Sequence, residues 1–503
     1  MLLPTAPDFL RLQARRRGAE GGLAFAGEIL PFAVLAGAAE TLAAWLVRRG
    51  LGAGQPVGIL AGNVPAMVAM LYATWGIGAV AVPVSVRSKA GEAGTLLGHA
   101  RACALLCDEP RTALAREIAA GAGIPAVVCH EVPPLRPRVL RRGVWPEAPA
   151  RPPRPNGLAA IAYTSGSSGS PKGVVVTHEN LLWATLACAQ ARGDRPEGVG
   201  ASISPLTHVP VLVSHLLCRI LLGARTVLFD RFDVAMVLEQ TERFGITDLP
   251  LIGGMVHDVV GLAEVPAAVR RSLRKVSVGG APTPMASKRR LLELLPGAEL
   301  IEAYGQTEST DGVLMSRGSA VLERDGTVGR MNPHVHVAIR RGDGSLAGAD
   351  EEGEIVVAGP TVMRGYHRDR AATAAALRDG WLHTGDLGRR DADGWFYLTG
   401  RVKDLIITGG ENVTPLEVEE VLRAHPDVAD VAVIGTPHPR WGEQVTAVVV
   451  RRPGTTVAPG DLAAFAAARL AGFKKPRRVE FVATLPRNAY NKVQTHVLRQ
   501  RFT

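Results

Sequence analysis

The chain has 503 residues, of which 47% are hydrophobic and 21% are charged. This composition allows several buried cores and excludes an intrinsically disordered chain, a disulfide-stapled miniprotein and a coiled coil. The five cysteines include no C-x-x-C pair and lack zinc-ribbon spacing. We therefore expect a reduced, cytoplasmic protein with two or more domains.

The net charge of +10 comes mainly from arginine, since only 8 of the 57 basic residues are lysine. From Arg401 onward the chain has 15 basic and 10 acidic residues, so this last part carries +5. A basic surface attracts phosphorylated molecules, nucleic acid or anionic membranes. No nucleic acid partner is expected, because no RNA platform, helix-turn-helix or zinc-finger pattern is present.

Residues 51–86 contain no charged side chain at all, but Gly, Pro and Asn interrupt them repeatedly. We interpret them as a buried strand at 57–60, a helix at 65–75 and a second buried strand at 79–82 rather than as a membrane span. The N-terminus shows no signal-peptide pattern, and secretion is not expected.

Strand-like apolar runs alternate with helical patterns through most of the chain, which predicts an α/β fold. We expect a large N-terminal domain of mostly parallel sheets flanked by helices, with a small β subdomain. Residues 133–157 hold eight prolines and six arginines, so we predict a surface connection there. After Gly400 the pattern changes to a small α+β unit, with helices expected at 415–424 and 460–470 and strands at 428–435 and 444–451. The predicted domains are 1–400 and 401–503, with a hinge near 400–404.

The strongest local signal is YTSGSSGSPKG at 163–173, between the strand-like runs LAAIA and GVVVTH. Its glycines let the backbone approach an anion, its hydroxyls donate hydrogen bonds, and Lys172 supplies a countercharge. The loop is not a Walker A motif, because Lys172 precedes a strand instead of opening a helix. The predicted phosphate-binding loop consists of Thr164, Ser165, Gly166, Ser167, Ser168 and Gly169.

This segment resembles the phosphate-binding signature of the adenylate-forming enzymes, which include acyl-CoA synthetases, adenylation domains and luciferases. Further segments that resemble the family follow in family order: GGAP at 279–282, YGQTE at 304–308, GWLHTGD at 380–386, GRVKDLIITGGENVTPLEVE at 400–419 and LPRNAYNKV at 485–493. The resemblance runs from about residue 25 to the C-terminus. It implies activation of a carboxylate by MgATP, followed by transfer of the acyl group to coenzyme A.

The resemblance implies roles for residues of the N-terminal domain. Lys172 and the loop would bind the β- and γ-phosphates, and Glu308, together with Thr164, would hold Mg²⁺, which prefers oxygen ligands. Tyr304 offers a face for adenine, and Thr307 resembles the hydroxyl that contacts the α-phosphate. The remaining nucleotide contacts implied are Gly280, Ala281, Pro282, Ala303, Gly305 and Gln306.

Near the predicted boundary, Asp386 is suited to accept hydrogen bonds from both ribose hydroxyls, and Arg401 resembles the second ribose contact. Lys403 aligns with the residue at which the C-terminal domain pivots between the two half-reactions. Lys492 resembles the catalytic lysine that reaches the α-phosphate and the attacking carboxylate. Asn491 stands where a glycine usually precedes this lysine, which leaves the exact placement of Lys492 open.

For coenzyme A, the resemblance implies that Gly409 and Gly410 line the pantetheine path. Trp441 and Phe473 could stack the adenine, and the basic residues that follow, Lys474, Lys475, Arg477 and Arg478, could pair its phosphates. Packing within a small domain is the alternative role of both aromatic residues.

His208 in SPLTHVP resembles the family residue at the acyl pocket, and a packed core histidine is its alternative. The pocket is expected at Val209–Leu212, Leu249–Met255 and Ala303–Gly305, with no cation for a second carboxylate. We therefore predict an aliphatic or simple aromatic monocarboxylate as substrate. Loading of a carrier protein's phosphopantetheine, or nucleotide binding without catalysis, are the alternative functions, and the oligomeric state stays open.

Overall fold

The computed structural model describes residues 3–17, 21–130, 136–142, 145, 147–164, 172–280, 283–409, 411–487 and 493–503. The chain divides into two compact units. Unit 1 comprises residues 1–166, 170–337 and 357–382, and unit 2 comprises 167–169, 338–356 and 383–503. Residues on both sides of the predicted boundary near residue 400 belong to unit 2, so that boundary stays a prediction.

The first sheet of unit 1 has the strand order β19-β9-β8-β4-β3-β5-β6-β7. Its central strands β8, β4, β3, β5 and β6 run parallel, while β9, β7 and β19 pair antiparallel at its two ends. Apolar residues of α4 and α5 pack on the sheet. The strands are β3 (Pro56–Leu60), β4 (Val80–Pro83), β5 (Ala104–Cys107), β6 (Ala126–Cys129), β7 (Pro137–Arg141), β8 (Leu158–Thr164), β9 (Lys172–Thr177) and β19 (Gly365–Tyr366), and the helices are α3 (Pro65–Gly76), α4 (Ala90–Ala100) and α5 (Thr112–Ala122).

The second sheet of unit 1 follows the order β16-β15-β14-β13-β12-β10-β11-β1-β2. Strands β14, β13, β12, β10, β11 and β1 are parallel, and β15, β16 and β2 are antiparallel to their neighbours. The strands are β1 (Gly22–Phe25), β2 (Glu28–Pro31), β10 (Val199–Ser202), β11 (Arg225–Leu228), β12 (Asp248–Ile252), β13 (Lys275–Gly279), β14 (Glu299–Gly305), β15 (Gly312–Arg317) and β16 (Thr327–Met331).

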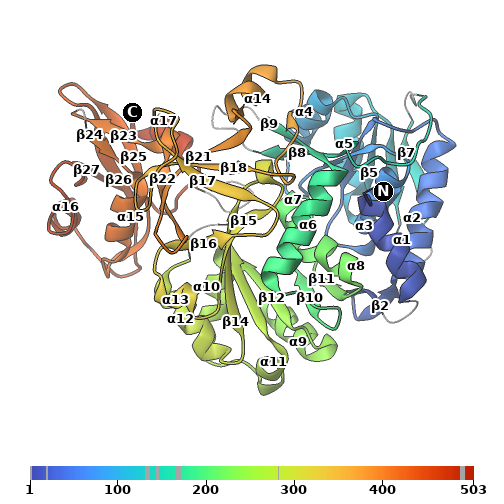
Figure 1. Ribbon diagram of the computed structural model, residues 1–503, viewed down its shortest axis with the longest axis horizontal. Helices are drawn as coiled ribbons and strands as arrows, with labels where there is room; N and C mark the ends of the chain where they lie inside the picture. The colour runs from blue at the N-terminus through green and yellow to red at the C-terminus, as the bar shows by residue number, and fades with distance from the viewer. Residues whose placement is uncertain are drawn as a thin grey trace. The chain divides into compact units, whose positions relative to one another are not determined.

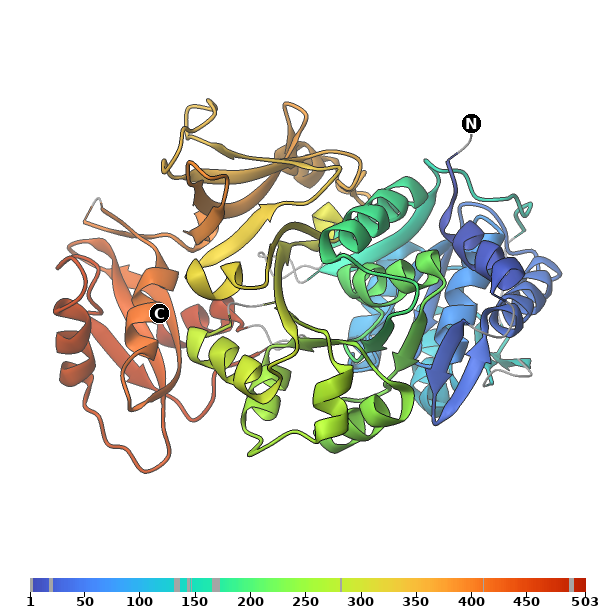
Figure 2. The same ribbon diagram turned by 60° about the horizontal axis from the view of Figure 1, so that its bottom comes forward.

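Helices surround both sheets of unit 1 (Figures 1 and 2). Helices α9 to α12 pack through apolar residues on the second sheet. Helix α6 contacts β8 and β9 of the first sheet and β15 of the second. The helices are α1 (Ala6–Arg16), α2 (Phe32–Val47), α6 (His178–Arg192), α7 (Val209–Val211), α8 (Cys218–Leu222), α9 (Val234–Phe244), α10 (Gly254–Val260), α11 (Ala267–Ser272), α12 (Met285–Leu294), α13 (Ala320–Glu323) and α14 (Arg370–Ala376).

Each sheet of unit 1 reverses its strand order at one point. From β3 the chain continues to β4 on one side, and β5 then pairs on the other side of β3. Strand β10 likewise has β11 on one side and β12 on the other. Ligand crevices in open parallel sheets form beyond the carboxyl ends of strands at such reversals.

A buried ionic cluster connects α6, α8 and two strands of the second sheet. Asp248 accepts hydrogen bonds from Arg192 and Arg219, and the Lys275 ammonium lies 3.1 Å from the Asp194 carboxylate. Arg192, Arg219 and Asp248 are each at most 5% exposed. Because a buried charge without a partner is costly, this cluster holds its helices and strands in one arrangement.

Unit 2 holds most residues of four strands, β17 (His336–Arg340), β18 (Gly353–Ala358), β21 (Trp381–Arg390) and β22 (Phe396–Arg401), in that strand order. Its C-terminal part is a sheet of order β24-β23-β26-β25, with β27 pairing β26. Val418 and Leu422 of α15 and Leu462 and Ala466 of α16 belong to its core. The elements are β23 (Ile406–Thr408), β24 (Glu411–Val413), α15 (Pro415–Arg423), β25 (Val428–His438), β26 (Gly442–Arg451), α16 (Pro459–Ala467), β27 (Arg478–Phe481) and α17 (Thr495–Phe502).

The α/β class predicted from the sequence is confirmed. The strands expected at 57–60 and 79–82 are β3 and β4, and the helix between them is α3, which is buried along almost its whole length. Among its described residues, the proline-rich stretch contributes the end strand β7. Within the described ranges, no helix has the length and apolarity that a membrane crossing requires.

Candidate active site

The predicted phosphate loop joins two strands that pair with each other. In the β8–β9 hairpin, Thr164 lies directly opposite Lys172, so the two residues flank the connecting loop. The loop residues Ser165, Gly166, Ser167, Ser168 and Gly169 lie outside the described residues. Of the predicted loop site, the structure therefore places Thr164 and Lys172 together.

Tyr366 connects Lys172 with Glu308. The Lys172 ammonium stands 4.9 Å from the centre of the Tyr366 ring, and the Tyr366 hydroxyl donates a 2.9 Å hydrogen bond to Glu308 Oε1. Burial, followed by the nearby Glu308 carboxylate, raises the pKa of Tyr366, so the phenol is protonated and donates. The two residues that the sequence assigned to phosphate and metal thus lie in one cluster, and Tyr366 was missing from that prediction.

Glu308 lies in a turn that forms hydrogen bonds with the segment 361–363. Its carbonyl accepts a 2.8 Å hydrogen bond from the amide of Met363, and the Thr310 hydroxyl donates to the carbonyl of Thr361 at 2.6 Å. Gln306 and Ser309 close the turn with a reciprocal capping pair. A half-buried carboxylate on such a fixed turn suits Mg²⁺, which takes one or two protein oxygens and completes its shell with phosphates and water.

The expected adenine contacts gather at neighbouring strand ends. Strand β13 pairs with β14 so that Gly279 lies opposite Ala303, and Tyr304 and Gly305 follow at the end of β14. Gly280 has φ of +78°, a backbone conformation that favours glycine. Ala281 and Pro282 lie outside the described residues. Thr307, the expected α-phosphate contact, is 9% exposed in the turn that follows.

His208 occupies the N-cap position of α7, from which the chain continues through a π-helical segment, η2 (Leu212–Leu217), into α8. Burial, followed by the charge of Arg87, lowers the pKa of His208 to about 4, so the imidazole is neutral near pH 7. π-helical segments occur frequently at functional sites. Arg87, whose charge acts on His208, was not among the residues predicted from the sequence.

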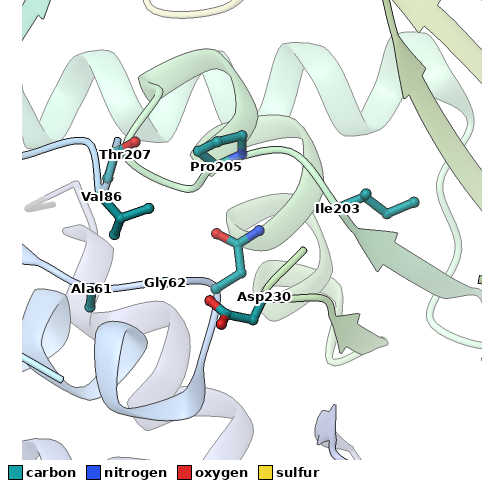
Figure 3. A pocket seen from close by; sticks show the side chains of 8 residues that line it. Ala61, Gly62, Val86, Ile203, Pro205, Thr207 and Asp230 are labelled. Carbon is teal, nitrogen blue, oxygen red and sulfur yellow. The ribbon is translucent and has the colours of Figure 1, made fainter. Parts of the chain in front are cut away.

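A small pocket, partly open to solvent, lies beside this segment. Figure 3 shows it between four loops, each following a parallel strand: β3, β4, β10 and β11. It therefore lies at the reversal points of both sheets. Arg111 donates to Asp108 at 2.8 Å and to Asp230 at 2.9 Å and so connects two carboxylates near this pocket. The lining residues are Ala61, Gly62, Asn63, Val86, Ile203, Pro205, Thr207 and Asp230.

In unit 2, the predicted ribose contacts form an ion pair between a buried carboxylate and a partly exposed guanidinium. Asp386 and Arg401 lie opposite each other on β21 and β22, and Arg401 Nε is 2.7 Å from Asp386 Oδ1. Asp386 is 2% exposed, while the Arg401 side chain is 34% exposed. The amide of Gly385 and the ring of His383 are held by the two oxygens of Glu354, at 2.9 Å and 2.6 Å. The segment HTGD is thus rigidly supported.

Trp441 and Gly409 also lie together in unit 2. The Gly409 amide donates to the Trp441 carbonyl at 2.9 Å, and a side chain at position 409, where φ is +61°, would touch the Trp441 ring. The ring of His438 stacks on Trp441 at 4.1 Å, and the Arg477 guanidinium lies 3.6 Å from its centre. Two groups this close cannot share one face, so both faces of Trp441 are covered.

Two of the other predicted residues of unit 2 contact neighbouring side chains of the C-terminal part. Phe473 packs against the core of the C-terminal sheet, and Lys474 pairs with Glu417 at 2.7 Å. Lys403 lies in a short 3-10 turn at Val402–Asp404. Gly410, Asn491 and Lys492 lie outside the described residues.

Comparisons with known proteins agree with this geometry. A family model for AMP-binding enzymes matches residues 10–367, and one for the AMP-binding enzyme C-terminal domain matches residues 417–492. A feruloyl-CoA synthase from Amycolatopsis is 35% identical over 95% of this chain and 94% of its own length. An indoleacetate–CoA ligase from Aromatoleum aromaticum is 32% identical over 97% of this chain and 96% of its own length.

Solved structures agree as well. The o-succinylbenzoate CoA synthetase of Bacillus subtilis, in complex with its acyl-adenylate intermediate, has a TM-score of 0.86 at 29% identity and covers 100% of this chain and 99% of its own. ATP-bound MatB from Rhodopseudomonas palustris has a TM-score of 0.88 at 29% identity and covers 99% of both chains. The chain belongs to the AMP-binding enzyme family and is an acid–thiol ligase of the acyl-CoA synthetase type.

Proposed function

We propose that this enzyme activates an apolar monocarboxylic acid, aliphatic or carrying a simple aromatic group, and joins it to coenzyme A. In the first half-reaction a carboxylate oxygen attacks the α-phosphorus of ATP, and pyrophosphate leaves. In the second the coenzyme A thiol attacks the acyl carbon, and AMP leaves. Cations and fixed donors must bring the two anions together in the first step.

The cluster of Lys172, Tyr366 and Glu308 is the observation that carries this proposal. Lys172 would bind the outer phosphates, and Glu308 would hold Mg²⁺, which when bound neutralises phosphate charge. Tyr366 keeps one carboxylate oxygen of Glu308 engaged through its 2.9 Å hydrogen bond and so fixes the orientation of the other. Asp386 and Arg401 would take the ribose, and Lys492 would reach the α-phosphate, as the resemblance implies.

The choice of acid rests on the ends of β12, β13 and β14. Ile252 lies opposite Gly279, and Gly279 lies opposite Ala303, so three adjacent strand ends offer small or apolar side chains. None of the residues expected to line the acyl pocket, at 209–212, 249–255 and 303–305, is cationic. Apart from Arg87, whose charge acts on the neighbouring His208, a second carboxylate would lose its hydration there without a countercharge.

Pyrophosphate exchange measured with a panel of acids tests the proposal. We expect exchange with aryl-substituted and aliphatic monocarboxylates and much weaker exchange with dicarboxylates of similar length. Thioester formation is then measured with coenzyme A and with a carrier protein bearing phosphopantetheine. Preference for a dicarboxylate would refute the assignment of the acid, and turnover with the carrier alone would refute the assignment of the acceptor.

A further inference from the structure

The N-terminal surface, formed by α1, β2 and α2, exposes an unusual share of large apolar side chains. Nine such side chains in the described ranges are at least 37% exposed, and five of them lie within residues 3–47. Isolated exposed apolar residues are normal, but a group of them on one surface indicates a partner. The five are Leu3, Leu12, Ile29, Val34 and Val47.

Helix α2 exposes mainly small or apolar side chains on its solvent side, with Glu40 and Thr41 as the polar exceptions. Its only charged residue is Glu40 among 16 residues. At 100° per residue, its exposed positions fall within an arc of about 140°. A helix that is apolar all round normally has both faces covered. The exposed positions are Ala33, Val34, Gly37, Glu40, Thr41, Ala44 and Val47, followed by Arg48.

Helix α1 packs beside α2 (Figures 1 and 2), and its own exposed side adds positive charge next to that helix. Its exposed Arg11, Leu12, Arg15 and Arg16 also fall within an arc of about 140°. Arg11 has an ion-pair contact with Asp8 at 3.7 Å. Arg15 and Arg16 are in no ion pair with any residue that the structure describes.

Just after the C-terminal end of α2, an arginine again lies beside apolar side chains. The Arg49 guanidinium lies 4.3 Å from the centre of the Trp45 ring and 5.5 Å from that of Trp145. The two tryptophans contact each other edge to face at 6.0 Å. Tryptophan and arginine together are typical of surfaces that meet the boundary between water and lipid.

We propose that the N-terminal surface docks on an anionic lipid bilayer. The apolar face of α2 would enter the headgroup region, while the arginines of α1 and of the α2 end would pair with acidic headgroups. Charge selects this partner over a second copy, because the five exposed arginines of this surface outnumber its acidic residues Asp8, Glu28 and Glu40, so two copies joined through this face would bring net positive charges together. The contact is peripheral, since the 16 residues of α2 are too few to span a bilayer.

Cosedimentation of the full chain with vesicles tests this proposal. We expect binding to phosphatidylcholine vesicles that contain phosphatidylglycerol, weaker binding at high salt, and little binding to phosphatidylcholine alone. Each basic side chain near such a surface contributes roughly fivefold to affinity, so R15Q/R16Q should lose about tenfold or more. Replacement of Leu12 and Val47 by serine should weaken binding at low and high salt alike.

The matched control is R270Q/R271Q. Both pairs are exposed adjacent arginines in the last turn of a helix, and both changes remove two charges. The control should bind vesicles like the unchanged protein, and every variant should keep its thioester-forming activity in solution. Absence of binding to anionic vesicles, or equal loss in the control, would overturn the proposal. A dimer that R15Q/R16Q or the serine variant abolishes in sedimentation would instead assign the surface to a second copy and overturn it too.

Discussion

At the residue scale, the site depends on side chains whose partners are remote in sequence. Tyr366 reaches Glu308 across 58 positions, and the Asp230 carboxylate accepts from Arg111 across 119. Neither contact has a local sequence pattern. The expected ligands of YGQTE were visible from sequence, whereas the tyrosine that orients one of them was not.

Replacing Tyr366 by phenylalanine should weaken adenylation with little loss of stability. The change removes a hydrogen bond to a carboxylate, which contributes about tenfold in an equilibrium constant. We expect roughly that loss in pyrophosphate exchange, with a higher magnesium concentration needed for half-maximal rate. Tyr397→Phe removes a similar bond, to Asp391 at 3.1 Å, and serves as the control. Equal effects of both changes, or an unchanged magnesium requirement, would contradict this role.

Asp311, three residues after Glu308, should make stability depend on pH. Burial raises the pKa of its carboxyl from 3.8 to about 7, opposed by the amide of Gly312, by Cys188 and by the charge of Arg192. Between about pH 4 and pH 7 the folded protein keeps a proton that the unfolded chain has released. Stability therefore falls as the pH rises through this range, by on the order of 4 kcal/mol from this group, and levels off above it.

Asp311→Asn should remove this slope. Denaturant unfolding of both proteins between pH 4 and pH 8 measures the slope. The variant should become more stable relative to the unchanged protein as the pH rises. Parallel curves for the two proteins would show that Asp311 does not carry the proton.

At the scale of elements, the end of β14 leaves no room for a side chain at position 305. The pairing of β14 with β15 shifts register between Tyr304 and Gly305. A Cβ atom on Gly305 would lie 2.3 Å from the carbonyl oxygen of Asp311 and 2.7 Å from Gly312 Cα. Glycine is required there by the close approach of two strands.

Gly305→Ala should therefore displace the turn that carries Glu308. We expect a loss of roughly 1 to 3 kcal/mol in unfolding free energy and a larger loss in ATP affinity than in stability. Thermal unfolding and ATP titration measure the two quantities. Gly91→Ala in α4 has no atom within 4 Å of the added methyl and should be neutral or stabilising. Normal ATP affinity in Gly305→Ala would show that the turn tolerates the shift.

For the molecule as a whole, unit 1 brings two parallel sheets together so that loops from both line one pocket. Strands β3 and β10 are the reversal points of their sheets, and residues that follow each of them line it. The ionic cluster around Asp248 fixes helices α6 and α8 to the second sheet. In unit 2, Arg401 forms an ion pair with Asp386, and Glu354 accepts a hydrogen bond from the neighbouring Gly385 amide.

The division of labour between the two half-reactions is a prediction about the whole molecule. If Lys492 serves only the first step, Lys492→Ala should suppress pyrophosphate exchange and leave thioester formation from supplied acyl-adenylate largely intact. Arg452→Ala, which removes an exposed charge from the same unit, should leave both steps unchanged. Equal loss of both steps in Lys492→Ala would show that the lysine does not withdraw between them.

The sequence by itself determined the family, the α/β class, the strands β3 and β4 and the helix between them, because these depend on local apolar patterns and on motifs with fixed spacing. Only the tertiary structure decided that Tyr366 holds Glu308, that Asp311 is buried beside Cys188, and that His438 and Arg477 cover Trp441. Strand order and helix packing create these contacts. A linear sequence reports the chemistry of each side chain, but its neighbours in space, which set its charge and its orientation, exist only after the sheets have assembled.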